Sequence, residues 1–315
     1  MDQEHAIADR EPMDDLQIPN LERAKSLAPL TTYQIGGSAD FFVAAKTPDA
    51  LVGAVREARE KGMPYFILGV GANILVTDKG FRGLVIRNEA TGSEFLDGNR
   101  LRADSGAIIA DLIAAARDRE LSGLEHYVGI PSTVGGALWQ NLHFLSPAPA
   151  RERTVFIAEV LERARLLTEA GTMKDVGADY FQFGYDYSTL HDRRDIVLDA
   201  TFALSPKSRE DIQRVMDENM AWRREKQPQL DEYPSCGSVF KKIEGVGAGR
   251  LIDQAGLKGF QIGGVMVSPK HANYFVNVGN ATASDVLQLI AEVQARVKHH
   301  SGYTLEPEIS VIGER

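Results

Sequence analysis

Cysteine is nearly absent from this 315-residue sequence. Cys236 is the only one, so neither an intrachain disulfide nor a cysteine-rich zinc site can form, which is typical of proteins of a reducing cytoplasm. No apolar run approaches the roughly 20 residues that span a bilayer. Positive charge is in the minority, with 35 Lys and Arg against 44 Asp and Glu. A general nucleic-acid binder is therefore excluded, because backbone phosphates require clustered cations. A basic pocket for one anionic small molecule remains open.

The first 20 residues have the strongest charge bias, with six acids against one arginine. They lack the basic and apolar regions of a signal peptide. We expect residues 1–20 to be a disordered acidic tail. Together with the missing membrane span, this predicts a cytoplasmic protein.

The rest of the chain has an ordinary globular composition, with 43% hydrophobic and 25% charged residues. Its periodicity predicts an α+β protein in three parts, over residues 21–87, 88–205 and 206–315. Helices are predicted after the Thr47-Pro48 cap, over Ile108 to Arg119, after Ser208, in GRLIDQAG and over Ser284 to His300. Strands are predicted on both sides of Gly36-Gly37 and throughout YTLEPEISVIG.

Two glycine-rich loops are candidate anion sites. In LGVGANILVTDKGFRGLVI, Gly69 and Gly71 let backbone N–H groups approach a phosphate without a Cβ in the way. The loop fails the test for a Rossmann site, because the third glycine is missing and a strand follows. In GIPSTVGGA, from Gly129 to Ala137, Pro131 and the Gly135-Gly136 pair shape a second tight backbone. Two such loops could clasp a dinucleotide; the alternative is a pair of turns without a ligand.

Other polar residues allow several interpretations. Ser238 in PSCGSVFKK forms Ser-x-x-Lys with Lys241, but the partner motifs of serine acyltransferases are missing, so a buried turn serine is the simpler interpretation. Glu306 and Glu308 in LEPEISVIG are predicted to share one face of a strand and hint at a polar site. The seven histidines include no His-Glu-x-x-His pattern, and we predict no metal.

Taken together and in order, these segments resemble the bacterial UDP-N-acetylenolpyruvoylglucosamine reductases. Five signatures carry the resemblance, which runs from about Ser26 to Gly313. They are TTYQIGG, LGVGANILVTDKGFRGLVI, GLEHYVGIPSTVGGALWQN, PSCGSVFKK with AGRLIDQAGLKGFQIGG, and LEPEISVIG. The short connection from Ser208 to Ser238 resembles the compact second type of the family.

The resemblance implies a two-part FAD-binding region of the PCMH/vanillyl-alcohol-oxidase type, followed by a smaller α+β substrate-binding domain. On this basis residues 21–87 and 88–205 are FAD-binding subdomains 1 and 2, and 206–315 bind substrate and end in a catalytic strand. The residues that would surround FAD are Gly69, Gly71, Asn73, Gly129, Ile130, Thr133 and Gly136, with Gly37 nearby. NADPH would reduce the flavin, and hydride would then pass to C3 of an enolpyruvyl group on a UDP-sugar.

That hydride pushes negative charge into a carboxylate that is already anionic, so the transition state needs preorganised donors or cations. The family uses an arginine and a glutamate there, and a serine that protonates C2. The resemblance assigns the serine to Ser238 and the glutamate to Glu308. Tyr185, Lys226 and Lys242 are expected to contact the substrate.

Asp186 in FGYDYS occupies the position of the family's arginine. Ala72, Ser132 and Lys242 are three further departures, of which Ala72 removes a hydrogen bond to FAD worth about 1 kcal/mol. One hypothesis is that another cation replaces the arginine, with Arg193, Arg194 and Lys242 as candidates. The alternatives are a divergent flavoprotein with another substrate, a related FAD oxidase, or a UDP-sugar-binding protein with a structural flavin.

Overall fold

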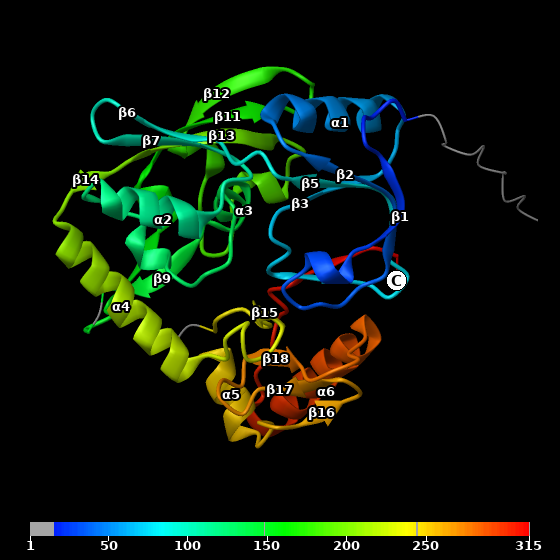
Figure 1. Cartoon of the computed structure of the whole chain (residues 1–315). Helices are drawn as coiled ribbons and strands as arrows, with labels where there is room; N and C mark the ends of the chain where they lie inside the picture. The colour runs from blue at the N-terminus through cyan, green and yellow to red at the C-terminus, as the bar shows by residue number, and fades with distance from the viewer. Residues whose placement is uncertain (1–15, 148, 244, 315) are drawn as a thin grey trace, which may run out of the picture.

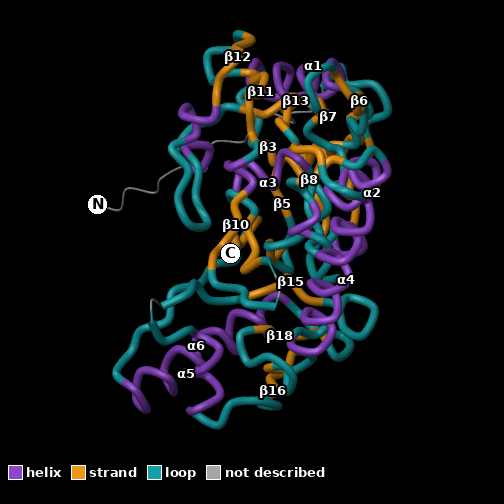
Figure 2. The backbone as a smooth tube through the Cα atoms, turned by 90° about the vertical axis from the view of Figure 1, so that its left-hand side faces the viewer, coloured by secondary structure: helices purple, strands orange, loops and turns teal. Residues whose placement is uncertain are grey.

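The computed structural model describes residues 16–147, 149–243 and 245–314, which form three bodies (Figure 1). Two bodies lie side by side, and the third lies below them in this view. In the view turned by 90° the third body projects away from the other two (Figure 2). The mixed α and β architecture agrees with the prediction from sequence.

The first body contains β1 (Glu22–Ser26), β2 (Ser38–Ala45), α1 (Pro48–Glu60), β3 (Tyr65–Leu68), β4 (Ile74–Val76) and β5 (Phe81–Asn88). Four of its strands form a sheet in the order β1-β2-β5-β3. β2 and β3 both run parallel to β5, so α1 is the crossover of a β-α-β unit. The Thr47 hydroxyl accepts a hydrogen bond from the Ala50 amide (3.1 Å), which confirms the predicted cap.

The second body contains the next nine strands and three helices. They are β6 (Ser93–Leu96), β7 (Arg100–Asp104), α2 (Ile109–Asp118), β8 (Leu121–Ser122), α3 (Val134–Gln140), β9 (His143–Ser146), β10 (Arg153–Phe156), β11 (Leu161–Leu167), β12 (Met173–Gly177), β13 (Ile196–Ala203), β14 (Ser205–Pro206) and α4 (Arg209–Lys226). The main sheet is antiparallel in the order β12-β11-β13-β7-β6, and β9 pairs with β10 as a separate hairpin. Met216 and Trp222 of α4 pack against the core of this body. The helix that opens the predicted segment 206–315 therefore lies on the second body and leads from it to the third (Figure 1).

The third body contains β15 (Ser235–Ser238), α5 (Ala248–Gln254), β16 (Gln261–Ile262), β17 (Val265–Val267), β18 (Tyr274–Asn277) and α6 (Ala283–Ser301). Its strands form an antiparallel sheet in the order β15-β18-β17-β16. Thr282 caps α6, as its place before an amphipathic run predicts. After α6 the chain returns to the first body, where β19 (Ser310–Ile312) runs parallel to β4.

Two predicted strands are wrong. The segment before Gly36 forms turns, and its central ring, Tyr33, is fully buried, so the strand begins only at Ser38. The last strand is confined to Ser310–Ile312. Glu306 and Glu308 therefore precede it and do not share a strand face.

Only residues 16–20 of the predicted acidic tail, residues 1–20, lie within the described ranges. Residues 1–15 lie outside the described residues. Leu16 and Ile18 are half-buried against the core of the first body, so the solvated segment does not extend to residue 20. Among the helices of the described ranges, none is long and apolar enough to cross a bilayer.

Candidate functional site

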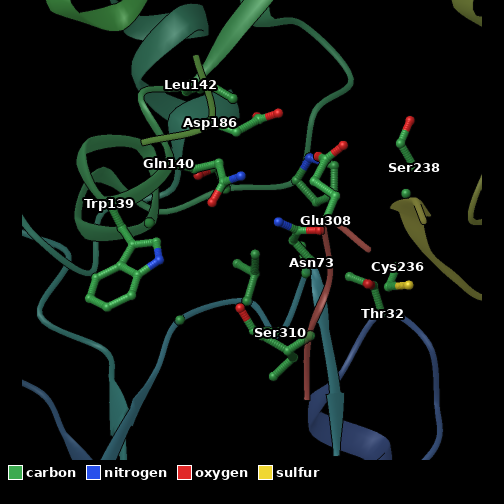
Figure 3. A pocket seen from close by; sticks show the side chains of 18 of the residues that line it. Thr32, Asn73, Trp139, Gln140, Leu142, Asp186, Cys236, Ser238, Glu308 and Ser310 are labelled. Carbon is green, nitrogen blue, oxygen red and sulfur yellow. The ribbon is translucent and has the colours of Figure 1, made fainter. Parts of the chain in front are cut away.

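A large cavity lies between the three bodies, with a volume of about 1710 Å³. Pockets for a single small ligand measure roughly 300–1,000 Å³, so this one has room for two ligands. Its lining comes from distant parts of the chain, within the ranges 62–74, 129–145, 185–197, 222–242 and 308–312. Figure 3 shows labelled side chains from all of these ranges around one space.

The first glycine loop lies between β3 and β4 and contributes Gly69, Gly71 and Asn73 to the lining. Gly71 has φ +69°, and a Cβ there would lie 2.3 Å from the carbonyl oxygen of Leu30. Its own carbonyl accepts a hydrogen bond from the Thr32 amide (3.1 Å). Only glycine fits this position, because both the backbone conformation and the close approach exclude a side chain.

The second glycine loop leads into α3 and contributes Gly129, Ile130, Thr133 and Gly136. Thr133 caps α3 by accepting a hydrogen bond from the Gly136 amide (3.2 Å). A Cβ on Gly69 would lie 2.8 Å from the Thr133 hydroxyl oxygen, so the two loops touch each other. Loops that are about 60 residues apart in sequence thus form one backbone surface.

Arg223 of α4 reaches this surface from the other side. It donates a hydrogen bond to the carbonyl oxygen of Gly129 (3.0 Å), and its side chain is buried, which lowers the pKa of its guanidinium. Its Nε atom and the Oε1 atom of Gln227 are buried polar atoms without a hydrogen-bond partner in the described chain. Both residues line the cavity. A cation and unpaired polar atoms beside two glycine loops suit an anionic ligand with hydrogen-bonding edges, such as the dinucleotide that the resemblance implies.

Ser238 is the last residue of β15 and faces the cavity (Figure 3). Its hydroxyl hydrogen-bonds with the hydroxyl of Tyr274 on the paired strand β18. Tyr274 also interacts with the Arg223 guanidinium. Burial raises the pKa of Tyr274, against the lowering effect of Arg223. The predicted catalytic serine therefore ends a buried chain of Arg223, Tyr274 and Ser238.

Glu308 faces the same space as Ser238 and Asn73 (Figure 3). Its amide donates to the carbonyl of Val239 (2.8 Å), and the Ser310 amide donates to the carbonyl of Asn73 (3.1 Å). Backbone bonds thus tie the segment from Glu308 to Ser310 to the residue that follows β15 and to the first glycine loop. Burial, and then the nearby Asp186, raise the pKa of Glu308 to about 8, although Lys241 opposes the rise. At pH 7 this carboxyl group is mainly protonated and can donate a hydrogen bond.

Asp186 points into the cavity from the turn between Gly184 and Tyr187 (Figure 3). Its φ is +51°, and its side chain is only 7% exposed. One carboxylate oxygen, Oδ2, has no hydrogen-bond partner in the described chain. The other, Oδ1, lies 3.8 Å from Nε2 of His143. The position where the resemblance expects an arginine thus holds a buried carboxylate next to an imidazole.

Some predicted site residues lie elsewhere. Lys226 forms an exposed ion pair with Glu225 (2.6 Å) and does not line the cavity. Gly37 is also outside the lining; it packs against Asp78, whose carbonyl oxygen would lie 2.2 Å from an added Cβ. Glu306 forms an ion pair with Lys241 at the surface. Lys241, the lysine of the Ser-x-x-Lys pattern, is therefore paired with a carboxylate.

The remaining predicted contacts do line the cavity. Tyr185, Lys242, Arg193 and Arg194 all contribute to it. Arg193, however, donates a hydrogen bond to the hydroxyl of Tyr180 (3.0 Å) and lies over its ring. Sequence reasoning missed His143, Arg223, Tyr274 and Trp139, which also line the cavity. Trp139 lies inside the signature GLEHYVGIPSTVGGALWQN but was not singled out there, and the other three lie in strands and near a helix end, where no motif marks them.

The described residues contain no group of three or more His, Cys, Asp or Glu side chains that could hold a metal ion. Cys236 is buried, and burial raises the pKa of its thiol. Because the thiolate is the reactive form, this cysteine is not a nucleophile at neutral pH.

Two family models match the chain. One is described as FAD binding domain and covers residues 39–177. The other is described as UDP-N-acetylenolpyruvoylglucosamine reductase, C-terminal domain, and covers residues 227–312. The second begins directly after α4.

Several similar proteins have the same name as this second family, and the match covers nearly their whole length. The UDP-N-acetylenolpyruvoylglucosamine reductase of Listeria innocua serovar 6a is 42% identical over 91% of this chain and 94% of its own. The one from Streptococcus pneumoniae (strain Hungary19A-6) is 39% identical over 91% and 93%. The crystal structure of UDP-N-acetylenolpyruvylglucosamine reductase from Thermus caldophilus superposes with a TM-score of 0.75 at 33% identity, covering 93% of this chain and 98% of that one.

Proposed function

The chain belongs to the UDP-N-acetylenolpyruvoylglucosamine reductase family, and from this premise we propose which of its residues carry the reaction. It is an FAD-dependent oxidoreductase that uses NADPH to reduce the enolpyruvyl group of UDP-N-acetylglucosamine enolpyruvate. The product, UDP-N-acetylmuramate, is a precursor of peptidoglycan. The predicted order of an FAD-binding region and a C-terminal substrate-binding domain is confirmed by the two matching family models.

FAD would be held by the two touching loops. Gly69, Gly71 and Asn73 would lie on one side of it, and Gly129, Ile130, Thr133 and Gly136 on the other. The Gly69–Thr133 approach and the unpaired Arg223 Nε support this placement. When bound, FAD supplies the hydride acceptor and donor of the reaction.

Ser238 would donate the proton to C2 of the substrate. A serine hydroxyl is a poor acid in bulk water and must be positioned to act. Here the Tyr274 hydroxyl bonds to it, with Arg223 behind the tyrosine. The cation stabilises negative charge that develops along this chain as the proton leaves the serine, and Tyr274 therefore acts as a positioning residue.

Glu308 would bind the carboxylate of the enolpyruvyl group as a neutral acid. Its raised pKa, about 8, makes it a donor at neutral pH. A neutral donor strengthens its hydrogen bond as charge accumulates on the substrate carboxylate, without repelling that carboxylate beforehand. Tyr185 and Lys242 line the same cavity and would contact other parts of the UDP-sugar. We further propose that the protein acts in the cytoplasm, where NADPH is supplied.

The observation that carries this assignment is the backbone bond from Glu308 to Val239, beside Ser238, at the cavity that both glycine loops line. Anaerobic stopped-flow absorbance tests it in two steps. NADPH should bleach the flavin spectrum of the purified holoenzyme, and UDP-N-acetylglucosamine enolpyruvate should then restore it. Ser238→Ala should slow the second step on the order of 100-fold and leave the first unchanged.

A second candidate rests on one observation, the buried carboxylate of Asp186 where the resemblance expects an arginine. It is a UDP-sugar-binding protein with a structural flavin. Such a protein would bind UDP-N-acetylglucosamine enolpyruvate in calorimetry, yet the reduced flavin would stay bleached after mixing. Rapid reoxidation by oxygen alone would instead indicate an oxidase.

A further inference from the structure

The cavity wall around Asp186 has an unusual charge arrangement. Asp186 and Glu308 interact electrostatically, and both face the space that also contains Ser238 (Figure 3). A substrate carboxylate that enters this space brings a third acidic group. Three acidic groups that face one space cannot all be ionised without a compensating cation.

His143 is the ring in contact with Asp186. Its Nε2 lies 3.8 Å from Asp186 Oδ1, and its side chain is 16% exposed and lines the cavity. Its Nδ1 lies 3.0 Å from the carbonyl oxygen of Asn141. A carbonyl oxygen can only accept, so Nδ1 carries a hydrogen in this arrangement.

The second ring nitrogen therefore decides the charge of the imidazole. If Nε2 has no hydrogen, its lone pair faces a carboxylate oxygen, which is repulsive. If Nε2 carries a hydrogen, the ring is a cation and the contact with Asp186 is attractive. At 3.8 Å the contact with Asp186 is longer than a hydrogen bond, so the Nε2 edge of the ring remains open to a ligand in the cavity.

The ring is also held in place. It packs at 4.5 Å between centroids against Tyr185 and at 5.2 Å against Phe156 of β10. The ionisable groups around it are Asp186 and Tyr185 from one turn, with Glu308 beyond Asp186. Because β9 begins at His143, its position is set by the hairpin with β10. The position of the ring is thus fixed before a ligand binds.

We propose that His143, held by Asp186, is the cationic group that binds the carboxylate of the enolpyruvyl substrate in this protein. This inference rests on the proposed function. His143 contacts the substrate and Asp186 is a positioning residue. His143 supplies the positive charge that the sequence lacks at position 186, Asp186 favours the charged form of the ring, and protonated Glu308 supplies a second donor.

Two substitutions test the pair in the FAD-loaded protein. His143→Gln keeps a donor of similar reach but removes the charge, and should slow substrate-driven flavin reoxidation on the order of 100-fold. Flavin reduction by NADPH should stay within about twofold, because the proposed contact is to the substrate carboxylate. The dissociation constant of UDP-N-acetylmuramate, which retains the carboxylate, should rise at least about tenfold by calorimetry. His300→Gln, at the exposed end of α6, is the matched control and should change none of these.

Asp186→Asn tests the positioning role with a spectroscopic readout. In the wild type, ¹⁵N chemical shifts of His143 at pH 7 should show a hydrogen on both ring nitrogens. In the variant Nε2 should lose its hydrogen while Nδ1 keeps it. A structural role of Asp186 alone would leave this signature unchanged.

Four outcomes separate the proposals. If the wild type is not reoxidised by UDP-N-acetylglucosamine enolpyruvate, the proposed function itself fails. If it is reoxidised and His143→Gln reacts as fast, the assignment of the cation is overturned. Loss of reoxidation in Lys242→Ala, with His143→Gln unaffected, overturns it in favour of the lysine. If His143→Gln does not retain FAD, the ¹⁵N signature of the wild type still decides, because a neutral ring refutes the pair.

Discussion

Replacing Glu308 by glutamine should change how the stability of the protein depends on pH. Burial and Asp186 raise the pKa of Glu308 from an ordinary 4.5 to about 8 in the folded protein. In the unfolded chain the carboxyl group loses its proton above about pH 4.5. Between these values the folded state therefore holds one more proton than the unfolded state.

The sign of the effect follows directly. The stabilisation is complete below the unfolded pKa and is lost as pH rises toward the folded pKa. The slope is at most ~1.4 kcal/mol per pH unit, so wild type loses about 2–3 kcal/mol between pH 5.5 and 7.5 through this group alone. Glutamine has no proton to lose, so Glu308→Gln does not share this loss.

The assay is thermal unfolding of both FAD-loaded proteins at pH 5.5, 6.5 and 7.5. The midpoint of the variant should rise relative to wild type by roughly 3–5 °C over this range. Asp186→Asn retains Glu308 but removes its charged neighbour, so its own pH dependence should be weaker than that of wild type. Parallel pH curves for wild type and Glu308→Gln would refute the argument, since they would mean that Glu308 titrates alike in both states.

Three further predictions concern the cofactor loop, a helix cap and the serine. Gly71→Ala places a Cβ 2.3 Å from a backbone oxygen at φ +69° and should cost ~1–3 kcal/mol and most bound FAD, measured as flavin absorbance per protein. Gly53→Ala, an exposed α1 position with free space around it, should instead stabilise by ~1 kcal/mol and retain FAD. Thr282→Ala removes the α6 cap and should cost ~1 kcal/mol in thermal unfolding without slowing turnover. Tyr274→Phe removes the partner of Ser238 and should slow substrate-driven flavin reoxidation ~10-fold in stopped flow, while NADPH oxidation is unaffected; equal slowing of both steps would contradict the positioning role.

The sequence predicted the elements whose signals are local. The caps at Thr47, Ser208 and Thr282 located three helices, because a short polar side chain before an apolar run satisfies the first amides of a helix. The glycines at 69, 71 and 129 marked the loops, since close backbone approach leaves a visible trace in residue type.

What the sequence could not provide was the pairing of distant segments. The sequence predicted Glu308 as one of two carboxylates on a strand. In the structure the Glu308 amide bonds to Val239, and the strand that pairs with β4 begins only at Ser310. Nothing local distinguishes Glu306, which is exposed, from Glu308, which is half-buried. His143 was missed for the same reason, because its role depends on a turn 43 residues later along the chain that brings Asp186 to it.

The parallel pairing of β19 with β4 has a consequence for synthesis of the protein. A ribosome makes β4 about 235 residues before the strand that completes its edge. Until residues 310–312 emerge, the nascent N-terminal body presents β4 unpaired, and neither Glu308 nor the Asn73 carbonyl has its backbone partner. The wall of the cavity at Asn73 is therefore completed late in synthesis, and a translation product that stalls before residue 310 leaves an open strand edge exposed to association with other chains.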